Sequence, residues 1–263
     1  MRVSKINNKG FSLIELAMVL FIISLILGGL LPPLATQIEQ RERERTQDQL
    51  DEIREVIYGY VLQNRYLPCP DCRDTTGNCA AATPNDGQED TINGAGTSLD
   101  CATEVGNLPW SDLGVQETDA WGQRFTYRVY IEFADRNDST NSDGAPTSPV
   151  APGTTGAVSC TPATSGVSFA LCSGGNITIL DSDGGANVAT NVPAIVISHG
   201  GNWDETPSND EAENYDDGSA GDVAGTFVYR DFTADSANPY DDLMIWISPH
   251  VLRSKMLSAG ILP

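Results

Sequence analysis

The chain begins with a strongly apolar stretch. From Phe11 to Leu31 the only clearly polar side chains are those of Ser12, Glu15 and Ser24. A run of about 20 apolar residues is long enough to cross a bilayer as a helix, which satisfies its backbone polar groups internally. Positive charges precede the run and none lies within it, which favours a cytoplasmic N-terminus. The pattern therefore predicts a transmembrane helix over residues 11–34.

Four helix-disfavouring residues lie near the end of this stretch. Gly28 and Gly29 lower helix stability, while Pro32 and Pro33 each remove a backbone donor and clash with the preceding turn. We therefore expect a kink or a locally melted stretch between about residues 28 and 34. The same residues also suit the interfacial end of a membrane helix, and the two interpretations are compatible.

Helical periodicity continues beyond these residues. Residues 40–49 contain no apolar side chain, but Glu39–Arg43 and Glu42–Arg45 have the spacing of helical ion pairs. Apolar residues then recur between Leu50 and Val61 at the spacing of one buried helical face. We predict that the helix continues over residues 35–66 and that its last turns pack on a globular head. The alternating charges favour a solvated face or a subunit contact over a nucleic-acid site.

The head, residues 67–263, shows the period-two alternation of strands most clearly at Arg124–Phe133. Shorter strands are predicted at Val167–Leu171, Asn176–Leu180, Ala194–Ser198, Thr226–Phe232 and Leu243–Ile247. Turns rich in glycine and asparagine separate them, which favours antiparallel pairing. A short terminal helix is expected over Pro249–Ala259. The predicted fold class is α+β, with residues 137–166 as a loop insertion because they are rich in Ser, Thr, Pro and Gly.

The composition of the chain argues against nucleic-acid binding and catalysis by the head. The formal net charge is −21. Sequence-independent DNA binding needs cationic groups that displace counterions, so a nucleic-acid partner is not expected. Of the two histidines, His199 follows an apolar strand and precedes two glycines, which favours a turn role. No nucleophile elbow, P-loop or HExxH motif is present, so we predict no catalytic residues and no enzyme.

Six cysteines lie on the far side of the apolar stretch: Cys69, Cys72, Cys79, Cys101, Cys160 and Cys172. An even number in an oxidising compartment favours disulfides. We expect Cys160 to pair with Cys172 and the other four to pair among themselves, in an order that stays open. The CxxC spacing of Cys69 and Cys72 also occurs in thiol oxidoreductases, but no thioredoxin-like strand–helix pattern surrounds it. The gaps beyond it do not form two zinc knuckles.

Acidic segments at residues 85–90, 181–184 and 203–242 supply oxygen atoms that a metal ion could use. Calcium takes about six to eight oxygen ligands from flexible loops, although none of these segments has a full EF-hand spacing. Two interpretations stay open for these segments, a solvated acidic loop and a calcium site. The preferred ligands are Asp204, Asp210, Asp216, Asp217, Asp222, Asp241 and Asp242.

The N-terminal sequence Lys-Gly-Phe-Ser-Leu-Ile-Glu-Leu, residues 9–16, resembles the type IV pilin family, which includes pilus subunits and the pseudopilins of type II secretion. The resemblance implies that residues 1–10 are a leader, which prepilin peptidase removes after Gly10 before methylating the new amine of Phe11. It also implies that Glu15 pairs with the terminal amine of a neighbouring subunit. Such a pair is reasonable because either charge alone would be strongly penalised in an apolar filament core.

The resemblance predicts a structural subunit of a type IV pilus-like filament. Its partners would be other pilins, prepilin peptidase and an inner-membrane assembly platform. The chain would span the inner membrane with its head in the periplasm, and then join an extracellular pilus or a periplasmic pseudopilus. Two alternatives remain: a pseudopilin of type II secretion, and a low-abundance tip adhesin that binds through its acidic segment and its Ser/Thr-rich loop. No cysteine follows Cys172, whereas many pilus-forming pilins close a C-terminal loop with a disulfide.

Overall fold

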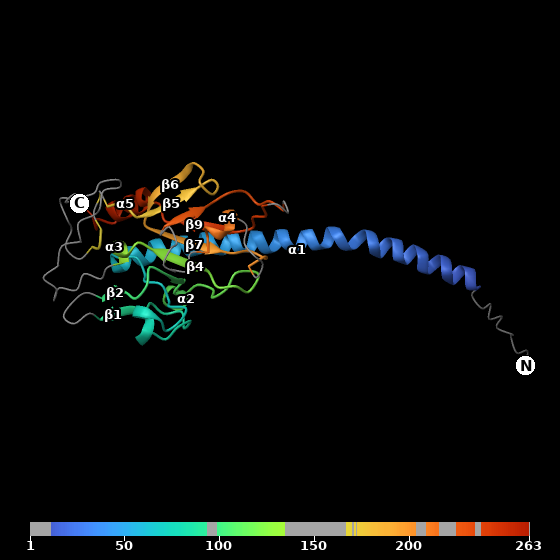
Figure 1. Cartoon of the computed structure of the whole chain (residues 1–263), viewed down its shortest axis with the longest axis horizontal. Coiled ribbons are helices and arrows are strands. Elements are labelled where there is room, and N and C mark those ends of the chain that lie inside the picture. Colours follow the sequence, from blue (N-terminus) through green and yellow to red (C-terminus); the bar gives the residue numbers. More distant parts are fainter. Residues whose placement is uncertain are drawn as a thin grey trace, which may run out of the picture. The chain divides into compact units, whose positions relative to one another are not determined.

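The computed structural model describes residues 12–93, 99–134, 167–169, 171, 173–203, 209–215, 225–234 and 238–262. Its helices are α1 (Leu13–Asn64), the 3-10 helix η1 (Gly77–Ala81), α2 (Trp110–Leu113), α3 (Ile131–Ala134), α4 (Asn209–Ala212) and α5 (Pro249–Ser258), shown in Figure 1. Its strands are β1 (Thr91–Asn93), β2 (Leu99–Cys101), β3 (Val105–Asn107), β4 (Thr126–Val129), β5 (Ile177–Leu180), β6 (Asn187–Val192), β7 (Ala194–Ser198), β8 (Thr226–Val228) and β9 (Leu243–Trp246). The chain divides into two compact units, residues 1–42 and 43–263.

Helix α1 is continuous from Leu13 to Asn64. Gly28, Gly29, Pro32 and Pro33 lie inside it, so the expected local melting is wrong for this structure. Each proline removes only its own backbone donor, and the leucines and isoleucines before Gly28 favour helix, so the element can persist across the interruption. A bend at these residues stays a prediction.

Two sheets form the head. The larger has the strand order β3-β4-β7-β9, and all of its neighbours are antiparallel. The smaller has the order β6-β5-β8, and β1 pairs with β2 separately. The α+β class with an antiparallel sheet is therefore confirmed. The expectation of antiparallel pairing throughout is wrong at one place, because β8 runs parallel to β5. Parallel neighbours need a long crossover, and the chain between β5 and β8 is long enough to include β6, β7 and α4.

Strand β7 explains how the two sheets and α1 share the interior. Every residue of this strand is buried. Ala194 and Val196 join the apolar cluster that includes α1, whereas Ile195 and Ile197 join the cluster formed with the smaller sheet. Because successive side chains of a strand point to opposite faces, β7 is covered on both sides. An uninterrupted apolar run is what such a strand requires.

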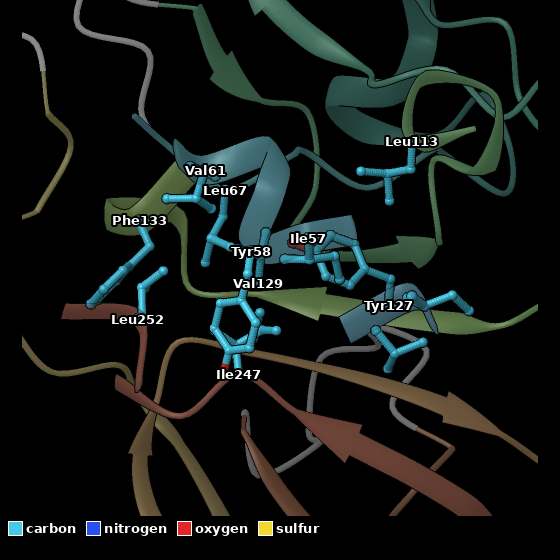
Figure 2. Packing of buried hydrophobic residues seen from close by; sticks show 14 of the residues in the cluster. Ile57, Tyr58, Val61, Leu67, Leu113, Tyr127, Val129, Phe133, Ile247 and Leu252 are labelled. Atoms are coloured by element: carbon cyan, nitrogen blue, oxygen red, sulfur yellow. The ribbon is translucent and has the colours of Figure 1, made fainter. Parts of the chain in front are cut away.

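The larger cluster forms between the last turns of α1, the four-stranded sheet and α5. Figure 2 shows Ile57, Tyr58 and Val61 of α1 gathered with Tyr127 and Val129 of β4. The apolar periodicity between Leu50 and Val61 therefore does bury one face of the helix, as predicted from the sequence.

The predicted strands differ from the observed ones mainly at their ends. β7 has the predicted bounds, and β5, β9 and helix α5 agree within one residue. The long strand expected at Arg124–Phe133 is shorter, because the chain turns into α3 after β4. The predicted strand Thr226–Phe232 likewise stops at Val228. Residues 167–169 and 171 contain no strand, and Val167 and Phe169 fill the larger cluster instead. The insertion at residues 137–166 lies outside the described residues.

Candidate cation site and the N-terminal segment

Two disulfides brace the loop that follows α1. Cys69 pairs with Cys101, and Cys72 pairs with Cys79. The expectation that these four cysteines pair among themselves is thus confirmed. Each cysteine of the CxxC motif bonds outside the motif, so the motif does not form the internal disulfide of a thiol oxidoreductase. The predicted pair Cys160–Cys172 lies outside the described residues.

The first acidic segment supports this loop, and the second supports the turn between β5 and β6. The Glu89 carboxylate accepts a hydrogen bond from the Cys69 N–H at 2.8 Å, and Asp90 accepts one from Cys72 at the same distance. Asp181 accepts a hydrogen bond from the N–H of Ala186 at 2.9 Å. Carboxylates that hold backbone donors have a structural role, so these contacts favour the solvated-loop interpretation for both segments.

At the start of α1, Ser12 and Glu15 form a reciprocal pair. The Ser12 N–H donates to Glu15 Oε2 at 2.9 Å, and the Glu15 N–H donates to Ser12 Oγ at 3.2 Å. This is a capping box, which satisfies two of the free donors at a helix N-terminus. The S-x-x-E spacing was visible in the sequence and could have been read this way. Gly10 and Phe11 lie outside the described residues.

The first turns of α1 expose their apolar side chains. All residues from Ser12 to Ile26 are exposed, and Leu13, Ile14 and Phe21 have exposed fractions of 86%, 72% and 64%. Within the described residues, no helix combines the length and the apolar content that crossing a membrane requires.

The third acidic segment contains a cluster of three carboxylates. Glu211 comes from α4, and Asp241 and Asp242 come from the residues just before β9. One oxygen from each lies within 4.8 Å of the other two. Glu211 and Asp242 are buried and Asp241 is half-buried. Three carboxylates this close repel one another unless protons or a cation reduce their charge.

Backbone and amide donors fix the orientation of the cluster. The N–H groups of Gly201 and Asn202 donate to Asp241 Oδ2 at 2.8 and 3.2 Å. Asn214 Nδ2 donates to Asp242 Oδ2 at 2.7 Å. Gly200 has a φ of +65°, and a Cβ there would lie 2.5 Å from the Asp241 carboxyl carbon. Only glycine therefore lets the turn after β7 approach Asp241 so closely.

The remaining oxygens of the cluster suit a cation. Within the described part of the chain, Asp241 Oδ1 and Asp242 Oδ1 are both buried and accept no hydrogen bond. Burial raises the pKa of Asp241 to about 6, and the neighbouring carboxylates of Asp242 and Glu211 contribute to the rise. Buried, unpaired carboxylate oxygens are costly, and a hard divalent cation is the ligand that satisfies them best.

The structure brings together only part of the predicted ligand set. Asp241 and Asp242 are in the cluster, but Asp210 instead pairs with Arg230 and accepts a hydrogen bond from Asn238 at 2.9 Å. Burial opposes the ionisation of Asp210, yet these partners and the Asp183 N–H hold its pKa below its usual range. Asp204, Asp216, Asp217 and Asp222 lie outside the described residues.

Two residues of this site were missed in the sequence. Glu211 is adjacent to Asp210, both are buried, and nothing in the local pattern indicates which of the two joins the cluster. His199 lies after β7 as predicted, but its ring also reaches the site: Nδ1 is 3.6 Å from Asp242 Oδ1, close enough for an ion pair when the ring is protonated. The position of His199 after a strand could be predicted from the sequence. Its proximity to Asp242 could not, because it depends on the path of the chain before β9.

Comparison with known proteins finds a family signature in the N-terminal segment. The family model described as the prokaryotic N-terminal methylation motif matches residues 5–31. No curated protein and no solved structure matches the chain. The match covers residues 5–10 of the predicted leader, the predicted cleavage position and the exposed apolar turns of α1. This segment of the chain carries the signature that type IV pilins and pseudopilins share.

Proposed function

We propose that the chain is a structural subunit of a type IV pilus-like filament. The observation that carries this proposal is the methylation motif at residues 5–31 on a helix whose first turns expose their apolar side chains. Such a surface needs a lipid or a protein to cover it. In the proposed cycle the helix first lies in the inner membrane and then packs against other subunits in the filament core.

Processing would occur after Gly10, with methylation of the Phe11 amine. In the free chain, Glu15 accepts the hydrogen bond of its own capping box. During assembly it would accept a hydrogen bond from the terminal amine of a neighbouring subunit. Such a charge-assisted hydrogen bond is stronger than the one from the backbone N–H. The capping box would then keep the Glu15 carboxylate oriented until the neighbour arrives.

Mass spectrometry of the N-terminus, on protein from sheared surface filaments and from inner membranes of the native host, tests this proposal. We expect a chain that begins at a methylated Phe11 in the filament fraction. The matched control is a host without prepilin peptidase, in which the leader should remain. A chain cut after the apolar run, or an uncut chain in the filaments, would refute the proposal.

The amount of the processed chain distinguishes the filament roles. A major pilin should dominate the sheared filaments, whereas a tip adhesin should be present in traces. If the filaments form normally without this chain but secretion stops, the chain is instead a pseudopilin.

We also propose that the cluster of Glu211, Asp241 and Asp242 binds calcium. The Oδ1 atoms of the two aspartates support this role, because both are buried and neither accepts a hydrogen bond from the described residues. When bound, the ion would supply the positive charge that three adjacent carboxylates lack. It would link α4 to the segment before β9 and to the turn after β7.

Replacing Asp241 by Asn should have opposite effects with and without calcium. In chelator at neutral pH, the variant should melt at a higher temperature than the parent, because the raised pKa of Asp241 means that its ionised form opposes folding. Parent stability should increase as pH falls through about 6, and the variant should lack this increase. In millimolar calcium, only the parent should gain thermal stability.

The control for this comparison is Asp231→Asn, which removes the same charge from an exposed position. It should respond to calcium as the parent does. Equal responses of the parent and Asp241→Asn to calcium would contradict the proposed site.

A further inference from the structure

The head contains a pocket of about 530 Å³ at one end of the four-stranded sheet. Asn107 ends β3, Thr126 begins β4 and His199 follows β7. The register of these strands brings the three residues to the same end of the sheet. The other walls come from the disulfide-braced loop and from the turn before β4. The volume is within the range of small-molecule sites, about 300–1,000 Å³.

Arg124 is held at the wall of this pocket by three different groups. Its guanidinium donates to Glu117 Oε1 at 3.0 and 2.6 Å and to Asn85 Oδ1 at 3.1 Å. The same group lies 4.9 Å from the centre of the Trp110 ring. The guanidinium is thus fixed in one plane, and its charge is offset by the Glu117 carboxylate.

A second set of hydrogen-bonded side chains lines the floor of the pocket. Arg73 donates to Thr126 Oγ1 at 2.7 Å, and this hydroxyl lies 2.9 Å from His199 Nε2. Polar groups that are already oriented lose little conformational entropy when a ligand binds. The pocket therefore presents donors and acceptors in a fixed arrangement.

Aromatic rings form the remaining side. The rings of His199 and Tyr215 are stacked with their centres 4.3 Å apart. The Tyr215 hydroxyl donates to the Trp203 carbonyl oxygen at 3.0 Å, which ties the two residues together. Trp203 itself is 45% exposed. A large exposed ring beside a polar pocket offers an apolar face to a ligand that is otherwise polar.

From this arrangement we propose that the pocket binds a neutral saccharide. A sugar hydroxyl both donates and accepts, which suits a wall where guanidinium donors alternate with carboxylate and carboxamide acceptors. The C–H face of a sugar ring would pack on Trp203. An apolar ligand would displace water from these polar wall groups without replacing the hydrogen bonds of that water. An anion would meet a guanidinium that Glu117 already balances, on a chain with a net charge of −21. This binding role goes beyond the filament role and does not depend on it.

The test is saturation-transfer NMR together with tryptophan fluorescence on the full-length chain. The detergent must be zwitterionic, because a detergent with a sugar headgroup would compete. The probes are glucose, galactose, N-acetylglucosamine and lactose. We expect at least one of them to bind. Trp203→Ala should weaken that binding by at least about 10-fold, whereas Trp203→Phe, which keeps an aromatic face, should retain most of it.

The matched control is Tyr229→Ala, which removes an aromatic side chain of similar exposure that does not line this pocket. It should bind the sugar as the parent does. Thermal unfolding of each variant confirms that it is folded. The proposal is overturned if none of the four sugars binds, or if Trp203→Ala binds as well as the parent.

Discussion

Replacing Cys69 and Cys101 together by alanine is expected to lower the free energy of unfolding by about 4 kcal/mol. The bond joins cysteines 32 residues apart, and closing a loop of that length in the unfolded chain accounts for a value of this size. Both cysteines are buried in the native state, where the bond ties β2 to the segment after α1. For a chain of this size the midpoint of thermal unfolding should fall by roughly 12 °C.

The second disulfide provides the control. Cys72 and Cys79 are only seven residues apart, so their replacement by alanine should lower stability by about 2 kcal/mol. All four tryptophans, Trp110, Trp121, Trp203 and Trp246, lie in the head, so fluorescence follows head unfolding in the full-length chain. If the short-loop variant were the less stable of the two, the loop-entropy explanation would be wrong.

Replacing Asn214 by alanine is expected to lower the free energy of unfolding by about 3 kcal/mol. This carboxamide is fully buried. Its Oδ1 accepts the Val228 N–H at 2.8 Å, and its Nδ2 donates to the Val228 carbonyl oxygen at 3.0 Å and to Asp242 Oδ2 at 2.7 Å. Alanine would leave the Val228 N–H and the Asp242 oxygen buried without these partners.

Urea unfolding followed by tryptophan fluorescence measures this effect. Asn187→Ala is the matched control, because Asn187 is exposed on the edge strand β6 and its loss should change stability by no more than about 0.5 kcal/mol. The Asn214 variant should also lose part of its response to calcium, because Asp242 would no longer be oriented. Stability equal to that of the Asn187 variant would show that the Asn214 hydrogen bonds contribute little.

The sequence was most informative where one physical requirement decided the structure. Strand β7 is buried on both faces, so its apolar run had one interpretation and its bounds were predicted correctly. The motif around Gly10 and Glu15 was equally clear, because a carboxylate at the start of an apolar run needs a specific explanation. In both cases the local sequence pattern alone was sufficient for the prediction.

Elements that depend on tertiary contacts were harder to predict. β6 is largely exposed and polar, with the sequence Asn-Val-Ala-Thr-Asn-Val, so it lacks the alternation of a half-buried strand. β1, β2 and β3 have only three residues each, too few for a period to be recognised. The carboxylate cluster joins α4 to residues far along the chain, and the separation of Asp210 from Glu211 depends on where Arg230 lies. Local sequence does not contain that information.

In the proposed filament, the Cys69–Cys101 bond would have a mechanical consequence for a subunit under tension. A pulling force that enters through α1 reaches Cys69 soon after the helix ends at Asn64, and the covalent bond passes it directly to β2. The chain between the two cysteines, which are 32 positions apart, is bypassed, so roughly 110 Å of chain, at about 3.5 Å per residue, is withheld from extension. A stretched subunit would therefore keep the loop that holds Glu89 and Asp90 intact, even if the end of α1 were pulled away from the sheet.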